Sequence, residues 1–203
     1  VVLYSGCRMH PWGCTMTFYV VDGMDGVGKD TVARMLVQSL ESKGRKVSCY
    51  KHPAENTVFG RIAARSLLKE GKLQEVIRAL SYFMDLFVSS IRKSGDEADD
   101  VVFVRYVMSA LYLKKPLSRC LFRVVHTLFP KADVGILVDA PAEVAIQRIH
   151  SRGEELEVYE TAGKLMPLRL DMRYMAEKLS WHILDNRGSY EDTRYELENI
   201  LYR

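Results

Sequence analysis

The chain has 203 residues, 48% of them hydrophobic and 27% charged, an ordinary composition for a soluble globular protein. This length suits a single domain with a central sheet that is covered on both faces. The formal net charge of +3 is too small to indicate a nucleic-acid surface and fits a small anionic substrate equally well.

Apolar runs along the chain predict buried strands, and the segments between them have helical patterns. The predicted strands are Thr17–Asp22, Val47–Lys51, Val101–Arg105, Val134–Asp139 and the shorter Trp181–Asp185. The predicted helices are Lys29–Ser42, Thr57–Lys69, Leu73–Lys93, Ser118–Leu128, Ala142–Ser151, Leu168–Leu179 and Tyr190–Leu201. Strands that alternate with helices indicate crossover connections. We therefore predict a three-layer α/β fold, with a five-stranded parallel sheet and helices on both faces.

Charged side chains end four of these predicted strands. They are Asp22, Lys51, Arg105 and Asp139. In open parallel sheets, ligands bind beyond the carboxyl ends of the strands. Topology alone therefore makes these four residues candidates for a functional site.

Three segments between the predicted elements are expected to be loops. Ser94–Asp100 is acidic and is interpreted as a solvated turn, and Lys114–Pro116 interrupts a helical pattern. Arg152–Met166 is charged and contains glycines, unlike the apolar patterns on either side. A loop of that length in a compact domain is often a mobile lid, so we predict a lid at about 152–166.

The N-terminal segment bears on the limits of the domain. Residues 1–15 lack the long apolar centre of a secretory signal, and Met16 directly precedes the first strand. We interpret residues 1–15 as a disordered leader or an upstream extension, and residues 16–203 as one domain. No run of about 18 apolar residues is present, so no membrane-spanning helix is expected.

The four cysteines form no C-x-x-C pair. Cys7, His10 and Cys14 could in principle ligate a metal, but no partner pair follows at a zinc-site spacing. The simpler interpretation is a set of reduced thiols in a cytoplasmic protein.

The stretch from Asp22 to Thr31 has the spacing of a phosphate-binding loop. Gly23-x-x-x-x-Gly28-Lys29 follows a buried strand and opens a helix, which is the context that such a loop requires. Glycines let the backbone N–H groups face an anion, and the lysine adds positive charge at the same point. The residues expected to contact a nucleoside triphosphate here are Asp22, Gly23, Met24, Asp25, Gly26, Val27, Gly28, Lys29, Asp30 and Thr31.

With these landmarks, the chain resembles the thymidylate kinases, a family of nucleoside monophosphate kinases, over nearly all of Met16 to Arg203. The motifs that carry the resemblance are DGMDGVGK, Lys51-His52-Pro53, Arg105-Tyr106 with Ser109, VDAPAEVAIQRIHSRGEELEVYE and WHILDNRGSYED. The resemblance implies a phosphate-loop kinase fold, ATP as phosphoryl donor, Mg²⁺ and a homodimer. It implies no nucleic-acid or membrane partner.

The resemblance also implies a role for each matching residue. Lys29 would contact the donor's outer phosphates, and Arg105 would bridge the two phosphate groups. Arg152, carried by the lid, would arrive on closure, when water is excluded. The phosphate loop contains no arginine and the lid begins with one, so the chain is similar to the lid-arginine type. Asp25 would bind the acceptor's sugar hydroxyl or its magnesium; Arg148 matches a basic position near the donor, and Lys51, Pro53, Tyr106 and Ser109 match positions near the acceptor.

Two departures from the family pattern concern the magnesium site. Asp30 stands where a serine or threonine helps to hold magnesium, and Val104 replaces the acidic residue of an Asp-Arg-Tyr/His motif. One hypothesis is that Asp30 takes over the metal-holding role, because magnesium accepts a carboxylate readily. The rival hypothesis is that Asp30 repels the triphosphate and that the protein is a weak or inactive kinase.

A third departure concerns the acceptor. Asp85 stands where the family has an arginine that faces the acceptor, so the charge is reversed. The acceptor could still be dTMP, held by cations such as Lys51 and Arg61. It could instead be another nucleoside monophosphate or a nucleoside, or Asp85 could be a surface residue. Our prediction is a thymidylate kinase-like enzyme that transfers the γ-phosphate of ATP to dTMP; the alternatives are another acceptor or a nucleotide-binding pseudo-kinase.

A dimer surface is expected on the long helix Leu73–Lys93. This helix has apolar residues on more than one face, which suits a contact between two subunits. Burial of both faces in the domain's own core explains the pattern nearly as well.

Overall fold

A computed structural model of the chain describes residues 16–54, 56–67, 71–113, 117–151 and 162–202. The segment interpreted as a leader, residues 1–15, lies outside these ranges. The first part of the predicted lid, residues 152–161, which begins with Arg152, also lies outside them. No helix in the described part of the chain is long and apolar enough to cross a membrane.

The described residues form a five-stranded, all-parallel sheet with the order β2-β3-β1-β4-β5. The strands are β1 (Thr17–Asp22), β2 (Val47–Lys51), β3 (Asp100–Val104), β4 (Val134–Asp139) and β5 (His182–Asp185). Each begins and ends within one residue of the predicted range. The reason is that the central strands are buried on both faces and therefore have continuous apolar sequences. All five residues of β3, for example, are buried.

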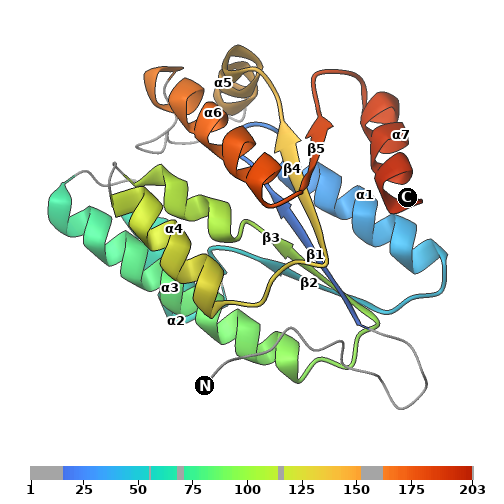
Figure 1. The fold of residues 1–203 in the computed structure, drawn as a ribbon, viewed down its shortest axis with the longest axis horizontal. Coiled ribbons are helices and arrows are strands. Elements are labelled where there is room, and N and C mark those ends of the chain that lie inside the picture. The colour runs from blue at the N-terminus through green and yellow to red at the C-terminus, as the bar shows by residue number, and fades with distance from the viewer. Residues whose placement is uncertain (1–15, 55, 68–70, 114–116, 152–161, 203) are drawn as a thin grey trace.

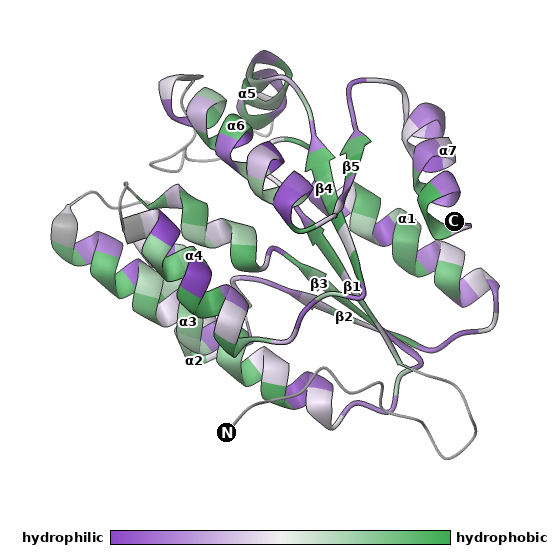
Figure 2. Ribbon diagram, viewed as in Figure 1, coloured by the Kyte–Doolittle hydropathy of each residue, from purple (hydrophilic) through white to green (hydrophobic). Residues whose placement is uncertain are grey.

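Helices cover both faces of the sheet, as Figure 1 shows. They are α1 (Lys29–Ser42), α2 (Val58–Leu67), α3 (Lys72–Ser94), α4 (Leu117–Leu128), α5 (Ala142–His150), α6 (Ala162–Lys178) and α7 (Tyr190–Leu201), with a 3₁₀ helix η1 (Val107–Tyr112) after β3. Helices α1 and α7 pack together on one face, and α6 packs against β4, β5 and η1. In Figure 2, β4 is mostly hydrophobic and the helices alternate between hydrophobic and hydrophilic residues. The buried hydrophobic residues come mainly from the strands and from one side of each helix. The predicted three-layer α/β architecture is therefore confirmed.

Helix α6 begins earlier than the sequence pattern indicated. Residues 162–166 were predicted to belong to the lid, but they form the first part of α6, which continues through Pro167. The helix buries a stripe of apolar side chains: Leu165, Leu168, Met172 and Ala176 are at most 7% exposed. Burial of Leu165 favours this early helical turn, so the prediction that residues 162–166 form a loop was wrong, whereas the lid itself stays a prediction.

Candidate active site

The phosphate-binding loop lies between the end of β1 and the start of α1. Gly26 and Gly28 have positive φ angles of 77° and 89°, a region that favours glycine. A side chain at Gly26 would also collide with the backbone of α5, because a Cβ there would lie 2.3 Å from the Ala145 carbonyl oxygen. Gly28 caps α1, and no side chain caps the N–H groups of the first turn. These N–H groups and the helix dipole favour an anion at this end of α1.

Lys29 lies within a buried ion cluster beside the loop. Its ammonium group donates to the Met24 carbonyl oxygen at 3.0 Å and to Asp25 Oδ1 at 3.1 Å. Arg105 from the end of β3 pairs with the same Asp25 oxygen, and the Tyr112 hydroxyl donates to Asp25 Oδ2 at 2.7 Å. Two cationic groups therefore converge on one carboxylate next to the phosphate loop.

The cluster changes the protonation equilibria of its members. Burial alone would raise the pKa of Asp25, but Arg105, Lys29 and the Tyr112 hydroxyl hold it well below its usual range. Burial and the neighbouring Arg105 lower the pKa of Lys29, and Asp25 opposes this change. Both oxygens of Asp25 therefore already have partners within the cluster.

Asp22 supports the loop from inside the domain. Its buried carboxylate accepts N–H groups from Gly23 at 2.9 Å, Tyr106 at 2.8 Å and Met108 at 3.2 Å. Burial raises the pKa of Asp22 despite these hydrogen bonds. The carboxylate thus ties the start of the phosphate loop to the turn that follows β3. Met24 and Val27, also expected near the donor, are buried in the core and offer their backbones to the site.

Residues after β3 line a largely apolar cavity. It contains about 690 Å³ of empty space, part of it open to solvent. Arg105 has a φ angle of 62°, in the left-handed region, and its side chain lies on the cavity wall. The wall also includes Pro53, Arg78, Tyr82, Leu86 and Ser109. Such a cavity, mostly apolar with a few polar groups, is typical of a small-molecule site. Tyr106 lines it too, but its hydroxyl is held in the core by the Pro130 carbonyl oxygen at 2.8 Å.

Asp30 and Lys51 pair with each other at the edge of the site. Lys51 Nζ lies 3.2 Å from Asp30 Oδ2, and the two side chains are 63% and 54% exposed. Thr31, the next residue, has its hydroxyl 3.4 Å from a guanidinium nitrogen of Arg34. Val104 is buried in the core between β1 and β2, so no acidic group stands at that point.

Asp85 is fully buried in α3, so the alternative that it is a surface residue was wrong. Its carboxylate accepts the Ala54 N–H at 2.8 Å and the Thr57 hydroxyl. Asp85 therefore holds the turn between β2 and α2, and the next residue, Leu86, faces the cavity. Arg61 is exposed on α2 and is not part of the cavity wall.

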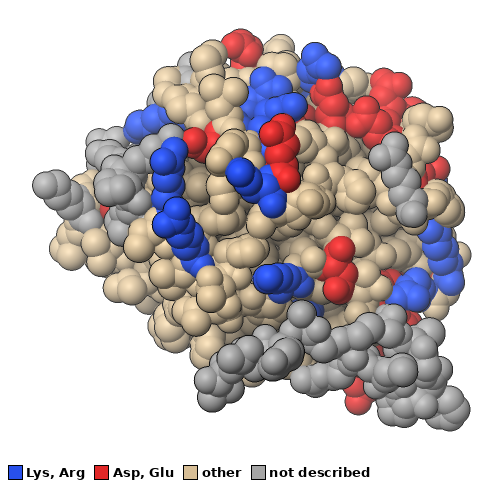
Figure 3. Space-filling view, viewed as in Figure 1, with Lys and Arg blue, Asp and Glu red and all other residues tan. Residues whose placement is uncertain are grey.

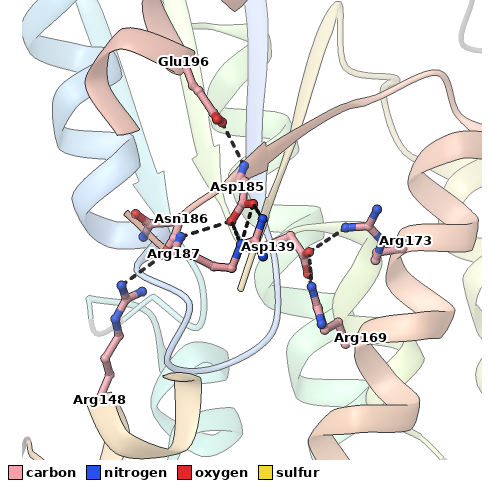
Figure 4. Close-up of polar contacts among 8 residues, drawn as sticks. All are labelled: Asp139, Arg148, Arg169, Arg173, Asp185, Asn186, Arg187 and Glu196. Atoms are coloured by element: carbon pink, nitrogen blue, oxygen red, sulfur yellow. Dashed lines mark hydrogen bonds and ion pairs between the residues drawn. The ribbon is translucent and has the colours of Figure 1, made fainter. Parts of the chain in front are cut away.

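A second group of polar residues lies behind the loop, at the ends of β4 and β5 (Figure 4). Asn186 Nδ2 donates to the Val27 carbonyl oxygen at 2.6 Å. Arg148 from α5 donates to the Asn186 carbonyl oxygen at 2.9 Å and to the Val27 carbonyl oxygen at 3.4 Å. Arg148 thus lies beside the phosphate loop and braces it, and its contact with the donor stays a prediction.

Asp139, at the end of β4, holds α6 in place. Arg169 donates to both of its carboxylate oxygens at 2.7 Å, and Arg173 donates to one of them at 2.6 Å (Figure 4). These contacts fix the helix that follows the predicted lid to the carboxyl end of the sheet. Asp139 was a candidate from topology, and its carboxylate pairs with Arg169 and Arg173 of α6.

Comparisons with known proteins agree with this geometry. A family model described as thymidylate kinase matches residues 21–197. The chain belongs to the thymidylate kinase family. The "Probable thymidylate kinase" of Pyrococcus abyssi is 30% identical over 191 residues, which cover 89% of this chain and 93% of that protein. The "Probable thymidylate kinase" of Metallosphaera sedula is 26% identical over 172 residues, 84% of each chain. The solved structure of thymidylate kinase from Candida albicans has a TM-score of 0.69 at 17% identity, covers 92% of this chain and 91% of that one, and shares the fold.

Membership of the thymidylate kinase family confirms the resemblance, the phosphate-loop kinase fold and the class of enzyme, a nucleoside monophosphate kinase. The comparisons favour thymidylate kinase over the alternatives of another acceptor or a pseudo-kinase. The individual roles given to the site residues stay predictions, as do Arg152 and the lid.

Four residues that contact the site were not indicated by the sequence. They are Tyr112, Arg169, Arg173 and Asn186. Asn186 belongs to the motif WHILDNRGSYED, directly after β5, so its place at a strand end was the available signal. Arg169 and Arg173 are one helical turn apart on α6, a spacing that two cations reaching one carboxylate would need. Tyr112 carries no such signal, because its contact with Asp25 depends on how η1 packs.

Proposed function

We propose that the chain transfers the γ-phosphate of ATP to dTMP and yields dTDP and ADP. The observation that supports this most directly is the position of Arg105. It pairs with Asp25 beside the phosphate-loop lysine, and it also lines the apolar cavity. A cation that lies between an anion-binding loop and a cavity is placed to contact a phosphoryl group as it passes from a donor in the loop to an acceptor in the cavity.

In this proposal, the donor's phosphates bind the N–H groups of the loop and Lys29. The acceptor's base and sugar occupy the cavity, whose wall includes Tyr82, Leu86 and Ser109. Arg105 neutralises charge between the two phosphates, because phosphoryl transfer depends mainly on positioning and electrostatic stabilisation. Arg152 would complete the site on lid closure and exclude water, so that hydrolysis does not compete.

The carboxylate of Asp30 is the group that fits a magnesium ion. The described residues contain no cluster of three or more His, Cys, Asp or Glu side chains that could hold a metal. Magnesium in nucleotide sites is commonly held by one or two carboxylates together with the nucleotide's phosphates, so a single carboxylate that can leave an exposed ion pair suffices. Asp30 follows Lys29 directly and is 54% exposed, whereas Asp25 is enclosed by its partners. When bound, the ion would neutralise charge on the donor's outer phosphates.

An acceptor panel tests the proposed activity. The full chain is incubated with ATP, Mg²⁺ and one acceptor at a time: dTMP, dUMP, dCMP, dGMP, dAMP or thymidine. Production of ADP and of the diphosphate is then followed by chromatography. The proposal predicts the highest kcat/KM with dTMP. A higher value with another monophosphate or with thymidine would assign a different acceptor, and tight ATP binding without turnover on any acceptor would indicate a pseudo-kinase.

The role of Asp30 has its own test. If Asp30 holds magnesium, Asp30→Ser should lower or preserve the magnesium-dependent affinity for ATP, because a hydroxyl is a weaker ligand than a carboxylate. The affinity is measured by calorimetry with and without Mg²⁺, and Asp192→Ser, at the exposed start of α7, is the control. Much tighter ATP and metal binding in Asp30→Ser would show that the carboxylate repels the triphosphate instead.

We also infer a homodimer through α2 and α3. Five apolar side chains of α3 lie three, four or seven residues apart and are 47–70% exposed: Leu73, Val76, Leu80, Phe87 and Ile91. The exposed Val58 and Ile62 of α2 extend this surface, since α2 and α3 pack together. A stripe of this length on a surface helix suits a second copy of the chain.

The side of the molecule seen in Figure 3 carries scattered basic groups and no single basic patch, in keeping with nucleotides as partners. A cytoplasmic location stays a prediction.

A further inference from the structure

The ion pair between Asp30 and Lys51 joins the donor side of the site to the acceptor side. Asp30 lies in the first turn of α1, next to the buried Lys29. Lys51 ends β2, two residues before Pro53, which lines the acceptor cavity. Among the described residues, neither side chain has another hydrogen bond or ion pair. Asp30 is a departure from the family pattern, whereas Lys51 matches a family position near the acceptor, and the fold brings the two side chains within 3.2 Å of each other.

Each of these two side chains can leave the other for a bound ligand at a small cost in free energy. Both side chains are more than half exposed, at 54% and 63%. Exposed ion pairs shift an equilibrium by only about 1.5-fold to 5-fold, because water competes for both charges. The other carboxylate near the loop, Asp25, is enclosed by Lys29, Arg105 and Tyr112 and cannot leave these partners for a ligand so easily.

The two proposed roles of these side chains compete with their pairing. A carboxylate that approaches magnesium on the donor gives up part of its interaction with Lys51. An ammonium group that approaches the acceptor's phosphate gives up its interaction with Asp30. The first ligand to bind therefore breaks the pair, and the second ligand finds its partner already released.

We propose that the Asp30–Lys51 pair couples donor and acceptor binding, so that the magnesium–nucleotide complex strengthens binding of the acceptor. This inference rests on the proposed function, because it needs both ligands to bind at the described site. Linkage requires the reverse effect to have the same size, so the acceptor strengthens binding of the magnesium–nucleotide complex equally. The expected coupling is about 1.5-fold to 5-fold, the range of an exposed ion pair.

Calorimetry on the full chain measures this coupling. dTMP is titrated into the protein alone, into the protein with Mg²⁺ and a non-hydrolysable ATP analogue, and into the protein with the analogue and EDTA. In the wild type, the Kd for dTMP should fall about 1.5-fold to 5-fold with the magnesium complex. It should change little with the analogue and EDTA, because no metal then draws Asp30 from Lys51.

Substitutions separate the pair from other sources of coupling. In Asp30→Asn, Lys51 is always free, so dTMP should bind tightly without the donor and the coupling should disappear. In Lys51→Met, dTMP should bind weakly under all three conditions, also without coupling. Asp30→Glu keeps the carboxylate and should retain the wild-type coupling. Arg194→Gln breaks a comparable exposed pair on α7, in which Arg194 Nε lies 3.2 Å from Glu198, and should leave the coupling unchanged.

Two results would overturn the inference while leaving the proposed function intact. One is separate binding of both nucleotides to the wild type with a coupling factor of 1. The other is wild-type coupling that persists in both Asp30→Asn and Lys51→Met. Failure of the wild type to bind dTMP or the ATP analogue at all would instead refute the proposed function, and the inference with it.

Discussion

At the scale of single residues, the site is organised around the buried carboxylate of Asp25. One of its oxygens meets two cations, Lys29 and Arg105, and the other accepts the Tyr112 hydroxyl. A buried charge is tolerated when it is paired and its remaining lone pairs accept hydrogen bonds. Tyr112 therefore contributes to the stability of the charged cluster without carrying a charge itself.

Removing this hydroxyl should destabilise the protein measurably. Tyr112→Phe deletes a hydrogen bond to a buried carboxylate, which typically contributes about 1.5 to 3 kcal/mol. We expect the free energy of unfolding, measured by urea denaturation, to fall by about that amount. Tyr195→Phe is the control, because Tyr195 is 69% exposed on α7 and should lose almost nothing. Equal stability of the two variants would mean that Asp25 does not depend on Tyr112.

Residue identity did not reveal the partners of Asp85 and Asp139. In the sequence both are acidic residues near the expected site, and Asp85 was weighed as an acceptor contact or a surface residue. Its real partners, the Ala54 N–H and the Thr57 hydroxyl, lie about 30 residues earlier in the chain, in a turn whose path no local pattern specifies. The partners of Asp139 depend equally on the packing of α6.

At the scale of elements, strand and helix positions could be predicted where the apolar pattern is strong. All strands were found within one residue, and the pattern is strongest in the central strands β3 and β4, which are buried on both faces and have continuous apolar sequences. The start of α6 was missed because Gly163 and Pro167 are typical of a loop. What decides the conformation there is the burial of Leu165, which is a tertiary effect.

Leu165 provides a direct test of this early helical segment. Leu165 is fully buried, and replacing a buried leucine by alanine costs about 2 to 5 kcal/mol through lost burial and the cavity left behind. We expect Leu165→Ala to lower the free energy of unfolding by that amount in urea denaturation. The neighbouring Met166 is 53% exposed, so Met166→Ala should change stability by less than about 0.5 kcal/mol. Similar losses in both variants would contradict a helix that begins at residue 162.

At the scale of the whole molecule, the exposed apolar side chains of α2 and α3 suit a contact with a partner. Exposed apolar side chains lie on both α3 and α2, and these two helices pack together. Monomeric proteins rarely expose large contiguous apolar surfaces. In a two-fold symmetric dimer the same surface serves both subunits, so the stripe of one copy can cover the stripe of the other.

Leu80 lies near the middle of the stripe and is 61% exposed in the single chain. Leu80→Glu would place a carboxylate on both sides of a two-fold contact, where neither has a counter-charge, and desolvation of each charge opposes association. If the proposed dimer forms through this surface, its Kd should rise at least about tenfold, since residues near the centre of an interface commonly contribute more than 1 kcal/mol. Sedimentation equilibrium measures this change directly. Leu170→Glu alters a comparably exposed leucine on α6, 65% exposed, and should leave the dimer intact. A monomeric wild type, or dissociation caused equally by both substitutions, would place the subunit contact elsewhere or remove it.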